Sequence, residues 1–121
     1  MKILFIEDLP HVADRVRASL KNLNLNESAF ADNAKKAREL LSLSEFDIVI
    51  CEVSLKGISC LEISHQARLK NKDCCVIVIT PLDSSDIAQK AVKEGAFDFI
   101  IRPAQMDKLD NLIKLYIAVK K

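Results

Sequence analysis

The stretch that decides the fold runs from Asp47 to Gly57 and reads Asp-Ile-Val-Ile-Cys-Glu-Val-Ser-Leu-Lys-Gly. Its four apolar residues, 48–51, predict a short strand buried on both faces, as in a parallel sheet that is covered by helices. The strand, expected over 47–52, ends on Glu52. In parallel sheets, ligand chemistry collects at the carboxyl ends of the strands. Glu52 is therefore the first candidate functional residue.

Outward from this strand, apolar runs alternate with amphipathic segments along the whole chain. Further strands are expected at 2–6, 27–31, 74–80 and 97–101. Helical spacing of apolar residues predicts helices over 10–23, after Asp32-Asn33, over 58–69, from 83–85 to Gly95, and through Leu109 to Ile117. The candidate helix caps are Asp8, Asp32-Asn33 and Asp83-Ser84-Ser85. This alternation predicts a three-layer (βα)5 fold, a flavodoxin-like doubly wound parallel sheet of strand order 2-1-3-4-5, and a single domain over 1–121.

Composition narrows the function classes. The 18 basic and 17 acidic residues leave a formal charge of +1, so nothing favours direct contact with nucleic acid. No apolar run approaches the roughly 20 residues of a membrane span. The apolar block at the start is also too short, before Glu7 and Asp8, for a secretory signal. We therefore expect a cytoplasmic protein without membrane contact.

The four cysteines show no metal-ligand spacing. They contain no C-x-x-C pair, and the two histidines have no helpful spacing to them. Cys74 and Cys75 are strand neighbours, so their side chains should point to opposite faces of the sheet. We expect reduced, mostly buried thiols rather than a redox or metal site.

Polar residues follow strands one, three, four and five where each strand ends. They are Glu7-Asp8, Glu52, Thr80 and Arg102-Pro103. Strand order 2-1-3-4-5 would bring these ends together, so that three carboxylates, a hydroxyl and a cation share one pocket. Clustered carboxylates repel one another unless a cation compensates. Either Arg102 or a bound Mg²⁺, which prefers oxygen ligands, could provide that charge.

With these residues in this order, the chain resembles the receiver domain of bacterial two-component response regulators over essentially its full length. The resemblance places Glu7 and Asp8 at the acidic pair, with Asp8 as a direct Mg²⁺ ligand. It places Glu52 at the phospho-acceptor position and Thr80 at the switch hydroxyl. Phe99 matches the switch aromatic, Arg102 replaces the usual lysine, and Pro103 follows with a peptide bond that is usually cis in the family. The resemblance also implies Mg²⁺ held by Asp8, Glu52 and Glu7, although no cofactor is required.

The departures from the family pattern indicate an atypical member, or pseudo-receiver. Glu52 stands where the family has Asp, and Arg102 where it has Lys. Pro81 follows Thr80 and should hold it in extended geometry. Lys56, Ser59 and Cys60 replace the usual Pro and Asp-Gly after the acceptor. Glutamate lengthens the acceptor side chain by roughly 1.5 Å, and such misplacement is costly in a positioned reaction.

We therefore expect a signalling module without enzyme activity, in which Glu52 acts as a built-in phospho-mimic bonded to Thr80 or Arg102. The resemblance implies signalling through the face of the fourth helix, fifth strand and fifth helix. It also implies a histidine kinase, an output domain or a second copy of the chain as the partner. One alternative is a receiver regulated by Mg²⁺ or residual phosphorylation. A small flavodoxin-like enzyme is a third hypothesis, disfavoured because Leu9-Pro10-His11 stands where a phosphate-binding loop would be.

Overall fold

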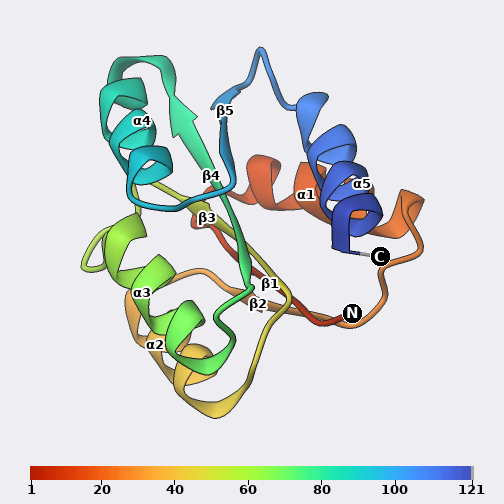
Figure 1. The fold of residues 1–121 in the computed structure, drawn as a ribbon. Coiled ribbons are helices and arrows are strands. Elements are labelled where there is room, and N and C mark those ends of the chain that lie inside the picture. The colour runs from red at the N-terminus through yellow and green to blue at the C-terminus, as the bar shows by residue number, and fades with distance from the viewer. Residues whose placement is uncertain (121) are drawn as a thin grey trace.

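The computed structural model describes residues 1–120, in which strands and helices alternate (Figure 1). The strands are β1 (Ile3–Ile6), β2 (Ser28–Ala31), β3 (Ile48–Glu52), β4 (Cys75–Pro81) and β5 (Asp98–Arg102). The helices are α1 (Pro10–Asn22), α2 (Ala34–Leu43), α3 (Cys60–Lys70), α4 (Ser85–Lys93) and α5 (Lys108–Lys120), with a 3₁₀ turn, η1 (Leu82–Ser84), before α4. The expected (βα)5 fold is confirmed.

All neighbouring strands are parallel and follow the expected order β2-β1-β3-β4-β5. The register decides which side chains meet at the carboxyl edge. Ile6 is opposite Cys51, so the residues that follow them, Glu7 and Glu52, are neighbours across β1 and β3. On the other side, Pro81 of β4 is opposite Arg102 of β5. The sheet thus delivers a carboxylate pair and a guanidinium group to one edge.

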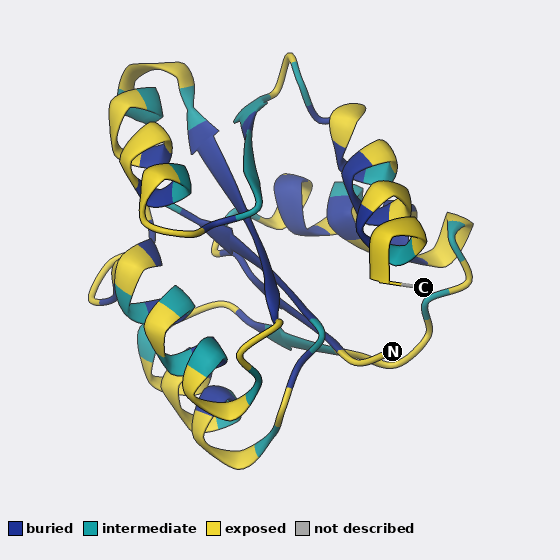
Figure 2. Cartoon of the chain, in the orientation of Figure 1, coloured by how far each residue is buried: buried dark blue, intermediate teal, exposed yellow. Residues whose placement is uncertain are grey.

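Helices cover both faces of the sheet, with α1 and α5 on one face and α2, α3 and α4 on the other (Figure 1). Alternate side chains of each strand enter the two layers, because successive residues of a strand point in opposite directions. Ile48 and Ile50 pack with α1 and α5, whereas Val49 and Cys51 pack on the opposite face. The three central strands β1, β3 and β4 are almost entirely buried, the outer strands β2 and β5 are less so, and the outer faces of the helices and many connecting loops are exposed (Figure 2).

The four cysteines are buried, as expected. Cys74 belongs to the cluster under α2, α3 and α4, and Cys75 to the cluster under α1 and α5, so the prediction of opposite faces is also confirmed. Burial raises the pKa of both thiols to about 12. These two groups are therefore protonated at neutral pH and are poor nucleophiles.

The first helix is capped differently from the expectation. Leu9 is at the N-cap position of α1, and Pro10 is in the first turn. Within residues 1–120, no side chain makes the cap hydrogen bond, and this includes that of Asp8. Glu7 acts at this helix start instead, because its Oε2 accepts the backbone N–H groups of Asp8 at 3.0 Å and of Leu9 at 3.2 Å. The prediction that Asp8 caps the helix was wrong. The buried Glu7, one residue upstream, binds the backbone N–H groups at this turn instead.

Of the other helix starts described here, those of α2 and α4 fall where they were expected and that of α3 does not. Asn33 caps α2 as predicted, accepting the Lys36 N–H at 2.8 Å. Helix α3 begins at Cys60 rather than 58, because Ser59 caps it. Helix α4 begins after the turn η1, and within residues 1–120 its capping residue Ser84 makes no side-chain cap bond. Separately, none of the helices described is long and apolar enough to cross a membrane.

Candidate functional site

The centre of the site is a buried ion pair between Glu52, at the end of β3, and Arg102, at the end of β5. Arg102 Nε donates to Glu52 Oε2 at 3.0 Å, and Arg102 Nη2 donates to Oε1 at 3.4 Å. The Glu52 side chain is fully buried, and that of Arg102 is 20% exposed. A guanidinium group can bind both oxygens of a carboxylate at once, which a lysine ammonium cannot match in geometry. Arg102 therefore occupies both oxygens of Glu52.

Ser54 adds a second contact to Glu52 that the sequence did not indicate. Its backbone N–H donates to Glu52 Oε1 at 3.3 Å. Every residue except proline has a backbone N–H group, so the identity of residue 54 does not indicate this bond. Only the position of Ser54, two residues after the end of the strand, could have suggested it. With this bond, both Arg102 and the β3–α3 loop hold the Glu52 carboxylate in place.

Glu7 is the second buried carboxyl group of the site, and it is 2% exposed. Burial and then the neighbouring Glu52 charge raise its pKa from 4.5 to about 8. Oε2 accepts two backbone N–H groups, whereas no hydrogen bond within residues 1–120 satisfies Oε1. A proton on Oε1 would let Glu7 donate to Glu52, which adjoins it. The crowding of carboxylates predicted from the sequence is thus relieved at neutral pH by a proton on Glu7 and by Arg102.

Asp8 does not join this buried pair. Its side chain is exposed, beside a groove of about 170 Å³ between the start of α1 and the end of β2. The three carboxylates do adjoin one another at this edge, because, besides burial, contacts with both Glu52 and Asp8 contribute to the raised pKa of Glu7, but only Glu7 and Glu52 are buried. Glu7 and Glu52 are buried together, and Asp8 faces solvent because the chain turns into α1 at this residue.

The donor set as arranged does not fit the Mg²⁺ that the resemblance implies at Glu7, Asp8 and Glu52. Both oxygens of Glu52 face the Arg102 guanidinium group, so this carboxylate is already paired with a cation. No three His, Cys, Asp or Glu side chains in the described part of the chain are placed to hold a metal ion together. A divalent cation at Glu52 would have to displace Arg102.

Thr80 of β4 and Phe99 of β5 make no hydrogen bond to this pair among the described residues. Thr80 is fully buried in β4, and its hydroxyl donates to the carbonyl oxygen of Pro81 at 2.8 Å. Of the two partners expected for Glu52, the structure thus has Arg102 and not Thr80. Phe99 is half-buried in β5, and the Lys108 Nζ atom lies 6.0 Å from its ring centre. The peptide bond between Arg102 and Pro103 is cis.

Comparisons with known proteins agree with this arrangement. The family model described as "Response regulator receiver domain" matches residues 3–114. Response regulator protein PilR of Pseudomonas aeruginosa is 31% identical over 112 residues, which are 93% of this chain and 25% of PilR. A cyclic di-GMP phosphodiesterase of Thermotoga maritima is 33% identical over 109 residues, 90% of this chain and 29% of that protein. The chain thus spans little more than a quarter of the length of these two relatives.

Solved structures show the same fold. A response regulator receiver domain protein from Clostridium thermocellum superposes with a TM-score of 0.82 at 25% identity, covering 98% of this chain and 95% of that one. The BeF3-activated DrrB receiver domain also gives 0.82, at 20% identity and 97% coverage of both chains. On the family match, the identity to PilR and this fold, the chain belongs to the response regulator receiver domain family and is a receiver domain of the two-component type.

Proposed function

We propose that this receiver domain is a pseudo-receiver that signals without being phosphorylated, with Glu52 as a fixed negative charge. The observation that supports the proposal is the two-point pairing of Glu52 with Arg102. A carboxylate that accepts a phosphoryl group needs one oxygen free for in-line attack. Both oxygens of Glu52 are already bonded, and the side chain is one methylene, about 1.5 Å, longer than aspartate.

The fixed charge imitates only part of a phosphorylated state. Glu52 carries one negative charge, whereas a phosphate carries nearly two. It engages the cation at the end of β5, but the Thr80 hydroxyl bonds to Pro81 instead. The proposed signal is therefore the constant ion pair between Glu52 at the end of β3 and Arg102 at the end of β5. Thr80 of β4 takes no part in it, because its hydroxyl bonds to Pro81.

The face of α4, β5 and α5 is the proposed contact surface for a partner. Two large apolar side chains of its helices are exposed, Ile87 of α4 at 50% and Leu115 of α5 at 52%. Exposed apolar side chains of this size are available for contact with a protein partner. The partner class is a histidine kinase, an output domain or a second copy of this chain.

Incubation with acetyl phosphate and Mg²⁺ is expected to leave the mass of the protein unchanged. The double variant Glu52→Asp with Arg102→Lys shortens the acceptor and frees its oxygens, so it is expected to gain about 80 Da, the mass of one phosphoryl group. Intact-mass spectrometry at neutral pH measures both. An adduct on Glu52 of the natural chain, located by peptide mapping, would contradict the proposal. Glu52→Gln with Arg102→Lys serves as the matched control that has no acceptor carboxylate.

The alternative is a receiver that is still regulated by Mg²⁺ binding or by residual phosphorylation. It is favoured by the exposed carboxylate of Asp8 and the free Oε1 of Glu7 among the described residues. Titration with Mg²⁺, followed by amide NMR, separates the two. We expect no saturable shift at Asp8, Leu9 or Ser54 in the natural chain, because Arg102 competes for Glu52. Saturable shifts at these amides would favour the alternative.

A further inference from the structure

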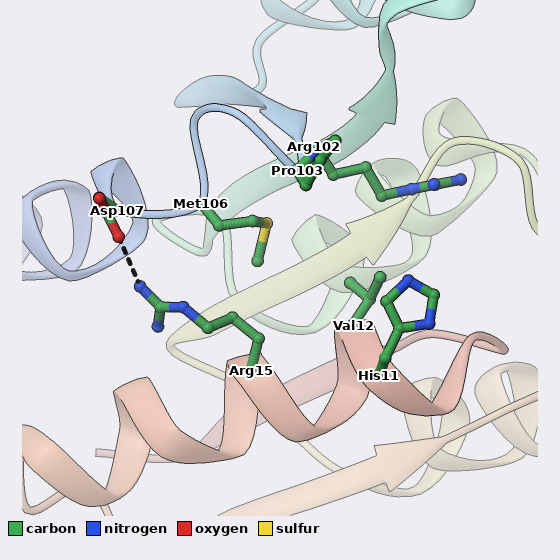
Figure 3. A pocket seen from close by; sticks show the side chains of 7 residues that line it. All are labelled: His11, Val12, Arg15, Arg102, Pro103, Met106 and Asp107. Carbon is green, nitrogen blue, oxygen red and sulfur yellow. Dashed lines mark hydrogen bonds and ion pairs between the residues drawn. The ribbon is translucent and has the colours of Figure 1, made fainter.

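A cavity of about 280 Å³ lies between the first two turns of α1 and the connection from β5 to α5. It is separate from the groove beside Asp8. Figure 3 shows Met106 pointing into it from above α1, with Arg15 and Asp107 on one side and His11 on the other. The lining residues are His11, Val12, Arg15, Arg102, Pro103, Met106 and Asp107.

The floor of this cavity is apolar and already formed. Val12 is 5% exposed and Met106 is 7% exposed, and both belong to the core cluster under α1 and α5. Methionine adapts its shape to an apolar partner more readily than a branched side chain does. An apolar floor with a few polar groups at the rim is the usual composition of a site for a small organic molecule.

The rim of the cavity favours an anion. It has the guanidinium group of Arg15, the carboxylate of Asp107 and the side chain of Arg102, whose guanidinium group already pairs with Glu52. Arg15 is held in place by a 2.6 Å hydrogen bond from Nη1 to the hydroxyl of the buried Ser19. Its Nη2 donates to Asp107 Oδ1 at 3.1 Å. Arg15 is thus oriented by a core residue and offers its outer edge to a carboxylate.

The carboxylate that now faces Arg15 is readily replaced. The Asp107 side chain is fully exposed, so its pairing with Arg15 gains little over hydration. A ligand carboxylate can exchange with it while burying an apolar body against Val12 and Met106, which Asp107 cannot do. The exchange keeps Arg15 paired and adds apolar contact.

We propose that this cavity binds a small organic anion with an apolar body, such as an aromatic or branched aliphatic carboxylate. The ligand carboxylate takes the place of Asp107 on Arg15, and its body covers Val12 and Met106. The far end of the cavity reaches His11 and Arg102. Arg102 is shared with Glu52, so an occupied cavity adjoins the ion pair of the site. Any effect of the ligand on signalling rests on the proposed function, whereas the binding itself does not.

Benzoate is the probe that tests the proposal, with benzamide as its uncharged counterpart. In NMR titrations of the whole chain, benzoate is expected to shift the Met106 methyl and the Val12 methyls saturably, and benzamide is not. Arg15→Gln should weaken benzoate binding by about tenfold, the usual loss of a charge-assisted hydrogen bond. Asp107→Asn should tighten it about two- to fivefold by removing the competing carboxylate.

Lys21→Gln is the matched control, because it removes one positive charge from an exposed position of α1 away from the cavity. It should leave the affinity for benzoate unchanged. Equal binding of benzoate and benzamide, shifts that do not saturate, or weaker binding by Asp107→Asn would overturn the proposal. Asp107 is on the surface, so its variant tests the site even if Arg15→Gln fails to fold. Phosphorylation of Glu52 by acetyl phosphate would overturn the proposed function while leaving a positive benzoate result intact.

Discussion

Arg102→Met is expected to lower the free energy of unfolding by about 3 kcal/mol, a large effect for a residue that is partly exposed. The reason lies in its partner. Glu52 is fully buried, so loss of the guanidinium group leaves an interior charge without its cation, with only the neutral donors Ser54 N–H and protonated Glu7 beside it among the described residues. Methionine keeps most of the volume of the arginine stem, so the loss reports charge rather than packing. Urea unfolding at pH 7 measures the loss of unfolding free energy. The dependence of that free energy on urea concentration should be the same in both variants, so that the difference reports stability.

The opposite truncation provides the control. Glu52→Gln leaves Arg102 without its carboxylate, but that side chain is 20% exposed and can turn to water, so we expect a cost of only about 1 kcal/mol. Glu52→Gln in the Arg102→Met background should recover most of the lost stability, because no buried charge remains. We interpret the pair as a buried Glu52 charge whose partner, Arg102, can reach solvent. A larger loss of unfolding free energy for Glu52→Gln than for Arg102→Met would refute this interpretation.

The fold could be predicted because its local signals agree with one another. The run of β-branched residues from Val76 to Thr80 identifies a strand unaided, and the alternation with helices implies a parallel sheet. The start of α3 could not be predicted because Ile58 is a buried loop residue, 5% exposed. Apolar spacing records burial, so it does not distinguish a loop residue that packs on the core from the first turn of a helix.

The residues at the carboxyl edge could be identified from the sequence, but their bonding could not. Strand order alone places Glu7, Glu52 and Arg102 together, since parallel strands end at one edge. The partner of the Thr80 hydroxyl depends on a side-chain rotation, and the carbonyl group of Pro81 is a local acceptor that competes with Glu52. Protonation of Glu7 depends on how deeply it is buried and on its distance from Glu52, neither of which residue type reveals.

The proton on Glu7 makes the free energy of unfolding depend on pH, and a variant of Glu7 can measure this contribution separately. Its pKa in the folded chain, about 8, is above the ordinary value of 4.5, so the folded chain holds a proton that the unfolded chain has released between these values. The folded state binds more protons there, and the contribution of Glu7 to stability is therefore complete below about pH 4.5 and lost as pH rises through about 8. Ionised Glu7 would place a second negative charge beside Glu52.

Glu7→Gln is accordingly expected to match the natural chain in stability near pH 4.5 and to exceed it by about 5 kcal/mol at pH 8.5, since each pKa unit is worth about 1.4 kcal/mol. The amide oxygen can accept the N–H groups of Asp8 and Leu9, and the amide nitrogen can donate to Glu52, so the neutral arrangement is kept at every pH. Urea unfolding from pH 4.5 to 9 measures the two curves. Glu39→Gln, on the exposed face of α2, is the matched control and should run parallel to the natural chain. Parallel curves for Glu7→Gln would mean that Glu7 is ionised in the folded chain, and the charge balance at the carboxyl edge would then need a second cation besides Arg102.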